Sequence, residues 1–329
     1  MNKQVKTTLK YSLFLGFGVT LMWWAYKDVD FEAMKSTLMR ANWIWIILAL
    51  FLNYWATAFR GFRWNTMLQP LGYKANTWTC VHSVAFGYLM NDLIPRSGEV
   101  ARCTLLNRAE KVPVDKLIGT VIMERIVDMI LLLTVILLTL LLHREALFQL
   151  FSWVDGTKGK VLIAVLIFLV VGLFIFLYLL RKFRHITFVA KVANFFQGIG
   201  SGLKTIVALK QKGLFTAYSL GIWVTWIIMT LCMMNALDET RSLGVADAML
   251  IVSAASLGMI FPSQGGLGAY HFMIMLAFVA MGFGNADDPQ KSDIGLTFAA
   301  ISWAGKTSLE LGMGAIGFVM VTVFKLKKQ

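Results

Sequence analysis

The sequence predicts an all-α membrane protein with several spans, and two observations support this fold class. Of its 329 residues, 58% are hydrophobic and only 15% are charged. Stretches with few or no charges, such as 129–142, 161–180 and 214–237, approach or reach the length that crosses a bilayer. A soluble domain with this much apolar surface would aggregate, so we expect the apolar side chains to face lipid.

The net charge of +13 and the three cysteines argue against several other classes. Excess Lys and Arg in a membrane protein marks cytoplasmic loops and attracts anionic headgroups, so no nucleic-acid partner is expected. Cys80, Cys103 and Cys232 are scattered, without a histidine at ligand spacing, which predicts neither a disulfide framework nor a metal site. Nucleotide-binding and hydrolase motifs are also missing. The sequence therefore predicts no cofactor and no enzyme activity.

The charge distribution decides which apolar segments are expected to span. If every apolar segment crossed the membrane, residues 181–212, with seven Lys and Arg and no acid, would lie on the side of the acidic loops. That placement contradicts the positive-inside rule. We therefore expect two re-entrant helical hairpins, 76–113 from the cytoplasm and 246–284 from outside. The six expected spans are 9–26, 43–59, 116–142, 160–180, 213–237 and 294–324.

This arrangement predicts one transmembrane domain, residues 1–329, built from two inverted repeats. The repeats, 9–142 and 160–324, share the order span, span, hairpin, span, and start on opposite sides of the membrane. Both hairpin turns have the pattern Pro-x-x-Gly, at residues 95–98 and 262–265. The expected location is the cytoplasmic membrane, with both termini in the cytoplasm.

The first of three polar clusters at expected membrane depth lies in residues 87–102. A charge at that depth costs about 2.5–3.5 kcal/mol, so charged residues there are candidates for function. Arginines beside backbone amides freed by a Pro/Gly break are suited to bind an anion. Glu99 lies three residues from both Arg96 and Arg102, and we expect it to hold them. The alternative is an ordinary cytoplasmic loop with solvated charges.

The second cluster is ERIVD, residues 124–128. The apolar stretch that follows has 14 residues, about 21 Å of helix, so a hydrocarbon core of about 30 Å draws the cluster into the membrane. Glu124 and Asp128 share one helix face, and Arg125 is spaced to pair with Asp128. The alternative is a structural ion pair that neutralises itself between helices.

The third cluster is Lys306 and Glu310, one helical turn apart in the last span. An apolar stretch, 311–324, follows it, much as 129–142 follows ERIVD. Nearby, residues 261–271 contain a glycine-rich turn with accessible amides and end on His271. This histidine is either a titrating group or a satisfied structural one.

At these motifs the chain resembles the lysylphosphatidylglycerol synthetase transmembrane-region family, the flippase-like domain found alone and at the head of aminoacyl-phosphatidylglycerol synthases. The motifs that carry the resemblance are RGFRW (residues 60–64), the segment from Asn91 to Arg102, ERIVD and the PSQGGLG turn. The resemblance implies that a lipid moves between leaflets while the polar clusters contact its headgroup. Two differences matter. The soluble aminoacyl-transfer domain is not seen, and His271 replaces the acid that typically follows the glycine turn.

The resemblance and the polar clusters together give a set of candidate residues. Those expected to bind the headgroup are Arg60, Arg63, Asn91, Arg96, Gly98, Glu99, Arg102, Gly265, Gly266, Gly268 and Lys306. Those expected to form an ion-pair or proton relay are Glu124, Arg125, Asp128, His271 and Glu310, and those that shape the two turns are Pro95 and Pro262.

These residues predict a transporter that moves a phospholipid, or another anionic or aminoacylated lipid, by alternating access. The expected partners are membrane lipids, and a homo-oligomer and a separate lipid-modifying enzyme remain open. Two rival functions also remain open. One is an integral membrane enzyme that transfers a group to a lipid, with Glu124 or Asp128 as the base. The other is a non-transporting partner of another envelope protein.

Overall fold

The computed structural model describes residues 16, 18–27, 29–143, 209, 211–261, 263–285, 288–289 and 291–325. Residues 1–139 and 213–329 form one structural unit, which holds every site residue discussed below. The other unit, 140–212, is described only near its two ends, so the expected span 160–180 lies outside the described residues. Of the expected first span, the described residues 18–26 are helical.

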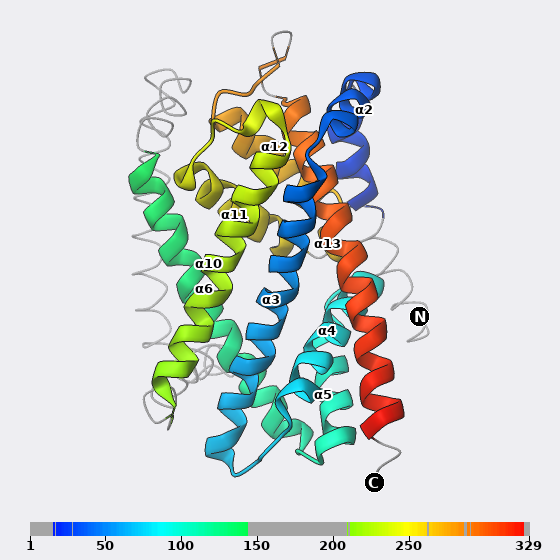
Figure 1. The fold of residues 1–329 in the computed structure, drawn as a ribbon, viewed down its shortest axis with the longest axis vertical. Helices are drawn as coiled ribbons and strands as arrows, with labels where there is room; N and C mark the ends of the chain where they lie inside the picture. Colours follow the sequence, from blue (N-terminus) through cyan, green and yellow to red (C-terminus); the bar gives the residue numbers. More distant parts are fainter. Residues whose placement is uncertain are drawn as a thin grey trace, which may run out of the picture. The chain divides into compact units, whose positions relative to one another are not determined.

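The described residues form helices joined by turns, with no strand among them (Figure 1). In chain order the elements are α2 (Phe31–Arg40), α3 (Trp43–Leu68), η1 (Gln69–Leu71), α4 (Thr77–Leu93), α5 (Gly98–Glu110), α6 (Val114–Leu142), α10 (Lys212–Ala236), η2 (Asp238–Thr240), α11 (Val245–Ile260), η3 (Gln264–Gly266), α12 (Ala269–Ala280), α13 (Asp293–Val319) and the π-helical segment η4 (Met320–Lys325).

Four of these helices are long and apolar enough to cross a membrane. They are Trp43–Leu71, Val114–Leu142, Lys212–Ala236 and Asp293–Val323. Each overlaps one of the six expected spans, and the first extends well beyond the expected end at residue 59. On α6 most side chains, Leu133 and Leu137 among them, are exposed rather than covered by protein. Because such surface is stable only against lipid, the fold is that of a multi-pass membrane protein.

Both expected hairpins form as pairs of helices. Helices α4 and α5 are joined by a turn at residues 94–97, and α11 and α12 are joined through η3. The first pair is closed from within, since the side-chain oxygen of Asn91 accepts a hydrogen bond from the backbone nitrogen of Gly98 at 2.8 Å. A Cβ at residue 98 would lie 2.1 Å from the carbonyl oxygen of Gly87, so only glycine permits this approach. That either hairpin is re-entrant, and that the halves are inverted repeats, stay predictions.

Helix α4 lies among α3, α5 and α13 and is packed closely against two of them (Figure 1). A Cβ at Gly61 of α3 would lie 2.5 Å from Val81, and one at Gly314 of α13 would lie 2.3 Å from the Cβ of Leu89. Small residues at such crossings let apolar helices approach and gain van der Waals contact. Since α4 is held on both sides, its polar residues are fixed between α3 and α13.

Candidate functional site

Three arginines and two carboxylates form a buried cluster that joins α3, α5 and α6. Arg63 donates to both oxygens of Asp128, at 2.7 and 3.2 Å, and to Glu124 at 3.3 Å. Arg60, one helical turn before Arg63, donates to Asp128 at 3.0 Å. Arg102 of α5 donates to the second oxygen of Glu124. Such charge-assisted bonds, some bidentate, fix the geometry of the group. We call these five residues the arginine cluster.

The cluster lies in the protein interior at the middle of a spanning helix. The side chains of Arg63 and Glu124 are fully buried, and that of Asp128 is 12% exposed. Asp128 has 14 residues of α6 on each side, since the helix runs from residue 114 to residue 142. At 1.5 Å per residue this puts it about 21 Å from either helix end. Any bilayer that α6 crosses therefore has this charge well inside its core.

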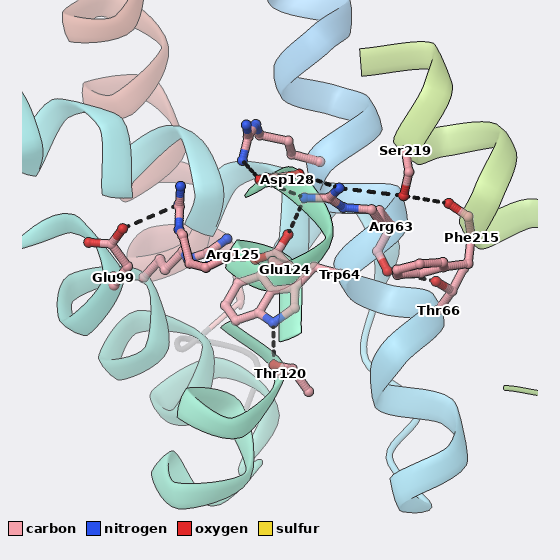
Figure 2. Close-up of polar contacts among 12 residues, drawn as sticks. Arg63, Trp64, Thr66, Glu99, Thr120, Glu124, Arg125, Asp128, Phe215 and Ser219 are labelled. Carbon is pink, nitrogen blue, oxygen red and sulfur yellow. Dashed lines mark hydrogen bonds and ion pairs between the residues drawn. The ribbon is translucent and has the colours of Figure 1, made fainter. Parts of the chain in front are cut away.

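Aromatic and hydroxyl groups hold the arginines in position (Figure 2). The indole nitrogen of Trp64 donates to Thr120 at 2.8 Å and so ties α3 to α6. The guanidinium of Arg102 lies over the ring of Trp64, 4.7 Å from its centroid. Such cation–π contacts stabilise a cation that has left water. From α10, Ser219 accepts a bond of 3.4 Å from Arg63.

The arginine cluster carries one positive charge more than it neutralises. Three guanidinium groups face two carboxylates, so its net charge is +1. The excess belongs to the group as a whole: Arg60 and Arg102 each contact one carboxylate, and the buried Nε atoms of Arg60 and Arg63 have no partner among the described residues. The ring of Trp226 lies 5.1 Å from the guanidinium of Arg60. An uncompensated positive charge in the interior is costly, so the site is electrostatically prepared to receive an anion.

A pocket opens beside the cluster between α4, α5 and α6. Its cavity volume is about 20 Å³. The residues that line it are Arg60, Val84, Gly87, Tyr88, Asn91, Gly98, Glu99, Arg102 and Arg125. At its rim Arg125 pairs with Glu99 at 3.2 Å, with 50% and 34% of their side chains exposed (Figure 2). In this conformation the pocket has room for about one water molecule, so a lipid headgroup can enter only when the surrounding helices part.

Two predicted pairings within the clusters are wrong. Arg125 does not pair with Asp128: the helix turns it toward Glu99 of α5, whereas Asp128 faces α3. Glu99 does not pair with Arg96 and Arg102. Arg102 pairs with Glu124 instead, and Glu99 pairs with Arg125. The two acids of ERIVD are neutralised by arginines of other helices, not by Arg125. Ion pairs between helices are what the structural alternative expected, so that alternative stays open.

Arg96 does not join the arginine cluster, which corrects its expected place beside Arg102. It is exposed, with a left-handed φ of 61° in the turn after Pro95. Its guanidinium reaches the other hairpin and donates to the carbonyl of Ile260 at 3.2 Å. In return, Gln264 donates to the carbonyl of Leu93 at 3.4 Å. The tips of the two hairpins, residues 92–97 and 260–266, are thus in direct contact.

The glycine turn is confirmed as a local structure, although its glycines do not line the pocket. Gly265, Gly266 and Gly268 all have positive φ, as a turn of this kind requires. The carbonyl of Gly265 accepts a bond of 2.7 Å from Trp303 of α13. A Cβ at Gly268 would lie 2.2 Å from the carbonyl of Gly18, so the turn also packs against the first described helix. Pro262 lies outside the described residues.

Lys306 and Glu310 form the expected pair, with 2.8 Å between Nζ and Oε2. Lys306 is not in the pocket lining. Its neighbours are Glu310 and Asp92 at the end of α4. His271 is 1% exposed and enclosed by aromatic rings, including that of Trp303 at 5.4 Å. Its Nδ1 has no partner among the described residues.

Several residues of these sites were missed by reasoning on the sequence. Trp64 stands in a motif, yet its bond to Thr120 and its stacking on Arg102 need three helices to meet. Ser219 and Trp226 lie in an apolar stretch and carry no pattern of their own. Asp92 was recognised as a member of the first polar cluster, but its neighbours Lys306 and Glu310 were not.

Comparison with known protein families shows that one family's sequence model covers these motifs. The sequence model of the family described as "Lysylphosphatidylglycerol synthase TM region" matches residues 11–287, which include every member of the arginine cluster. The chain belongs to this family. The lysylphosphatidylglycerol synthase TM-region family thus accounts for both hairpins and for three of the four long apolar helices in the described part of the chain.

Curated relatives of this family member carry general names. UPF0104 membrane protein PH1989 of Pyrococcus horikoshii is 26% identical over 193 residues, which are 54% of this chain and 56% of that protein. UPF0104 membrane protein MJ1595 of Methanocaldococcus jannaschii is 28% identical over 129 residues, 38% of this chain and 37% of that protein. The chain thus matches about half or less of the length of these relatives. No solved structure matches it.

Proposed function

We propose that this protein is a lipid transporter that moves a phospholipid, or another anionic or aminoacylated lipid, between the leaflets of the cytoplasmic membrane. The observation that carries the proposal is the arginine cluster, a buried group with a net charge of +1 beside a pocket that opens between helices. A phosphate that enters an apolar region must be neutralised, because desolvating it without a cation is prohibitive. Arg60 offers that charge, and its planar fork suits two phosphate oxygens.

The contact between the hairpin tips supports alternating access as the mechanism. It includes two hydrogen bonds of 3.2 and 3.4 Å to backbone carbonyls and the packing of Asp92 against Gly265, without an ion pair among those described. Each neutral or singly charged bond contributes only about 0.5–3 kcal/mol net, so such a contact can open and close. In the proposed cycle the headgroup enters the pocket, contacts Arg60, Arg102 and Arg125, and crosses when the tips separate. The acyl chains remain in lipid.

A leaflet-exchange assay tests the proposal. The purified protein is reconstituted into liposomes with a trace of fluorescent phosphatidylglycerol, phosphatidylethanolamine or phosphatidylcholine, and the outer leaflet is bleached with an impermeant reductant. We expect faster bleaching of the inner-leaflet pool than in protein-free liposomes. If none of these lipids, nor an aminoacylated phosphatidylglycerol, exchanges faster, the transport proposal fails and the enzyme and partner alternatives gain weight.

A matched pair of variants tests the anion site. Arg60→Gln brings the arginine cluster to neutrality while Arg63 still pairs with Asp128, so we expect the exchange of phosphatidylglycerol to fall at least tenfold. Arg108→Gln removes one positive charge from the exposed face of α5 and should leave exchange unchanged. Equal rates in the two variants would contradict the role of Arg60 without contradicting transport itself.

A further inference from the structure

A second ionic group lies where α4 meets α13, apart from the arginine cluster. Glu310 is buried, with 4% of its side chain exposed, and pairs with Lys306. The carboxyl group of Asp92, one residue before the end of α4, lies within hydrogen-bonding reach of Glu310 and next to Lys306. Asp92 also touches the other hairpin, because a Cβ at Gly265 would lie 2.8 Å from its Oδ1.

The composition of this group requires one more positive charge. Two ionised carboxylates and one ammonium would leave a net charge of −1 in a largely buried place, which is costly. Ionised carboxylates are also hydrogen-bond acceptors only, so two of them within hydrogen-bonding reach repel unless one carries a proton. The Oδ2 atom of Asp92 is buried, and no N–H or O–H group of the described residues donates to it.

The neighbouring groups do not supply the missing charge. From α12, Tyr270 faces the pair, and its hydroxyl donates to Ser302 at 3.1 Å. From α4, Tyr88 interacts electrostatically with Glu310 and with Arg60 of the arginine cluster. The η3 turn contributes the backbone of Gly265. Among the described residues, Lys306 is thus the one cation that faces the two carboxyl groups from the packed elements.

We propose that Asp92 and Glu310 together hold one exchangeable proton beside Lys306. One carboxyl group carries the proton and donates it to the other carboxylate, and the ammonium of Lys306 neutralises the charge that remains. Release of the proton to water leaves two carboxylates in contact and a net charge of −1. The repulsion moves Asp92 away from Glu310 and shifts the contact between Asp92 and Gly265. Loss of the proton therefore weakens the contact between the two hairpin tips.

This site gives the proposed transporter a driving ion, and in that respect the inference rests on the proposed function. A proton taken up on one side favours closed tips, and its release on the other favours their separation. The lipid would then cross in step with the proton. The proton site itself does not depend on transport, so its existence can be tested on the purified protein alone.

Infrared difference spectroscopy of the purified full-length protein tests the site directly. Wild-type protein should show a protonated-carboxyl band that disappears as pH rises. Asp92→Asn and Glu310→Gln should both lack this band, because each leaves one carboxylate that Lys306 alone neutralises. Asp115→Asn, which changes an exposed acid at the start of α6, should keep the band. If the band persists in both Asp92→Asn and Glu310→Gln, the proposal is overturned.

A sodium titration at constant pH separates the proton from a metal cation. The wild-type band should not change when potassium is replaced by sodium. Loss of the band on adding sodium would assign the site to that ion and overturn the proposal.

The coupling is tested in liposomes with an imposed pH difference. One pH unit biases the lipid distribution at most about tenfold per proton carried. We expect such a bias for wild-type protein and for Asp115→Asn, and its loss in Asp92→Asn, whose remaining exchange should also be slower because its permanently neutral group favours closed tips. A bias that survives in Asp92→Asn overturns the coupling. Absence of any lipid exchange in wild-type protein overturns the proposed function. The infrared experiment would still test the proton site, because it does not depend on transport.

Discussion

Arg102 of α5 and Glu124 of α6 form an ion pair whose side chains are 5% and 0% exposed, between helices that follow one another in the chain. Glu124 also binds Arg63, so it neutralises two arginines, while Arg102 has one described carboxylate partner. The two partners are therefore not equivalent. Removing Glu124 raises the net charge of the arginine cluster from +1 to +2, whereas removing Arg102 lowers it to zero.

This asymmetry gives the first prediction. Glu124→Gln should destabilise the protein by about 3–5 kcal/mol, the usual cost of leaving a buried charge without its partner. Arg102→Gln should cost clearly less, because Glu124 keeps Arg63. The double variant returns the net charge to +1 and should be more stable than Glu124→Gln alone. Thermal unfolding in detergent measures all three, and losses that simply add in the double variant would contradict the charge argument.

The exposed ion pair of Arg125 and Glu99 should contribute much less to stability than the buried ion pairs. Both side chains are at least a third exposed, and such pairs contribute at most about 1 kcal/mol. We therefore expect Arg125→Gln to leave the midpoint of thermal unfolding nearly unchanged. Because Arg125 lines the pocket, exchange of phosphatidylglycerol should nevertheless slow, with a weaker dependence on salt than in wild type. A large loss of stability would mean that Arg125 is structural.

A third prediction concerns the closed hairpin of α4 and α5. Gly98→Ala places a methyl group 2.1 Å from the carbonyl of Gly87, so the helices must part, and unfolding should shift to lower temperature by several degrees. Gly119→Ala is the matched control. Residue 119 is also helical, but nothing lies within 4 Å of its Cβ position, and alanine there should be neutral or slightly stabilising. Equal shifts in both variants would contradict the close approach.

The sequence was sufficient to predict what depends on composition and local pattern. Four of the expected spans are long apolar helices, and both hairpin turns lie where the Pro-x-x-Gly patterns stand. It also identified Glu124 and Asp128 as charges at membrane depth, whereas Arg60 and Arg63 came from the family resemblance alone and lay beyond the expected span 43–59. These predictions succeed because the cost of burying a charge or an unpaired amide is a property of each segment alone.

The partners of those charges could not be predicted from spacing. Asp128 is three residues from Arg125, which favours a pair on an isolated helix. In the folded protein two arginines of α3 reach Asp128 instead, and Arg125 turns to α5. Which of several spaced partners a carboxylate takes depends on how helices cross, and glycines such as Gly61 set that crossing. The same limit hid the partners of Asp92, which lie on a helix more than two hundred residues away.

The last prediction tests whether the hairpin tips must separate. In a background without Cys80, Cys103 and Cys232, the pair Leu93→Cys and Gln264→Cys should form a disulfide on mild oxidation, because the Gln264 side chain lies 3.4 Å from the carbonyl of Leu93. Lipid exchange should then stop and return on reduction.

The control cross-link joins two helices whose contact is not expected to open. Asn65 of α3 donates to Thr77 of α4 at 2.8 Å, away from both tips, so Asn65→Cys with Thr77→Cys should also cross-link without stopping exchange. A cross-link that halts exchange at both places would report general rigidity rather than a gate. If exchange continues with the tips joined, the lipid does not pass by their separation, and alternating access at this contact is wrong, because a covalent bond of about 2 Å leaves no room for movement.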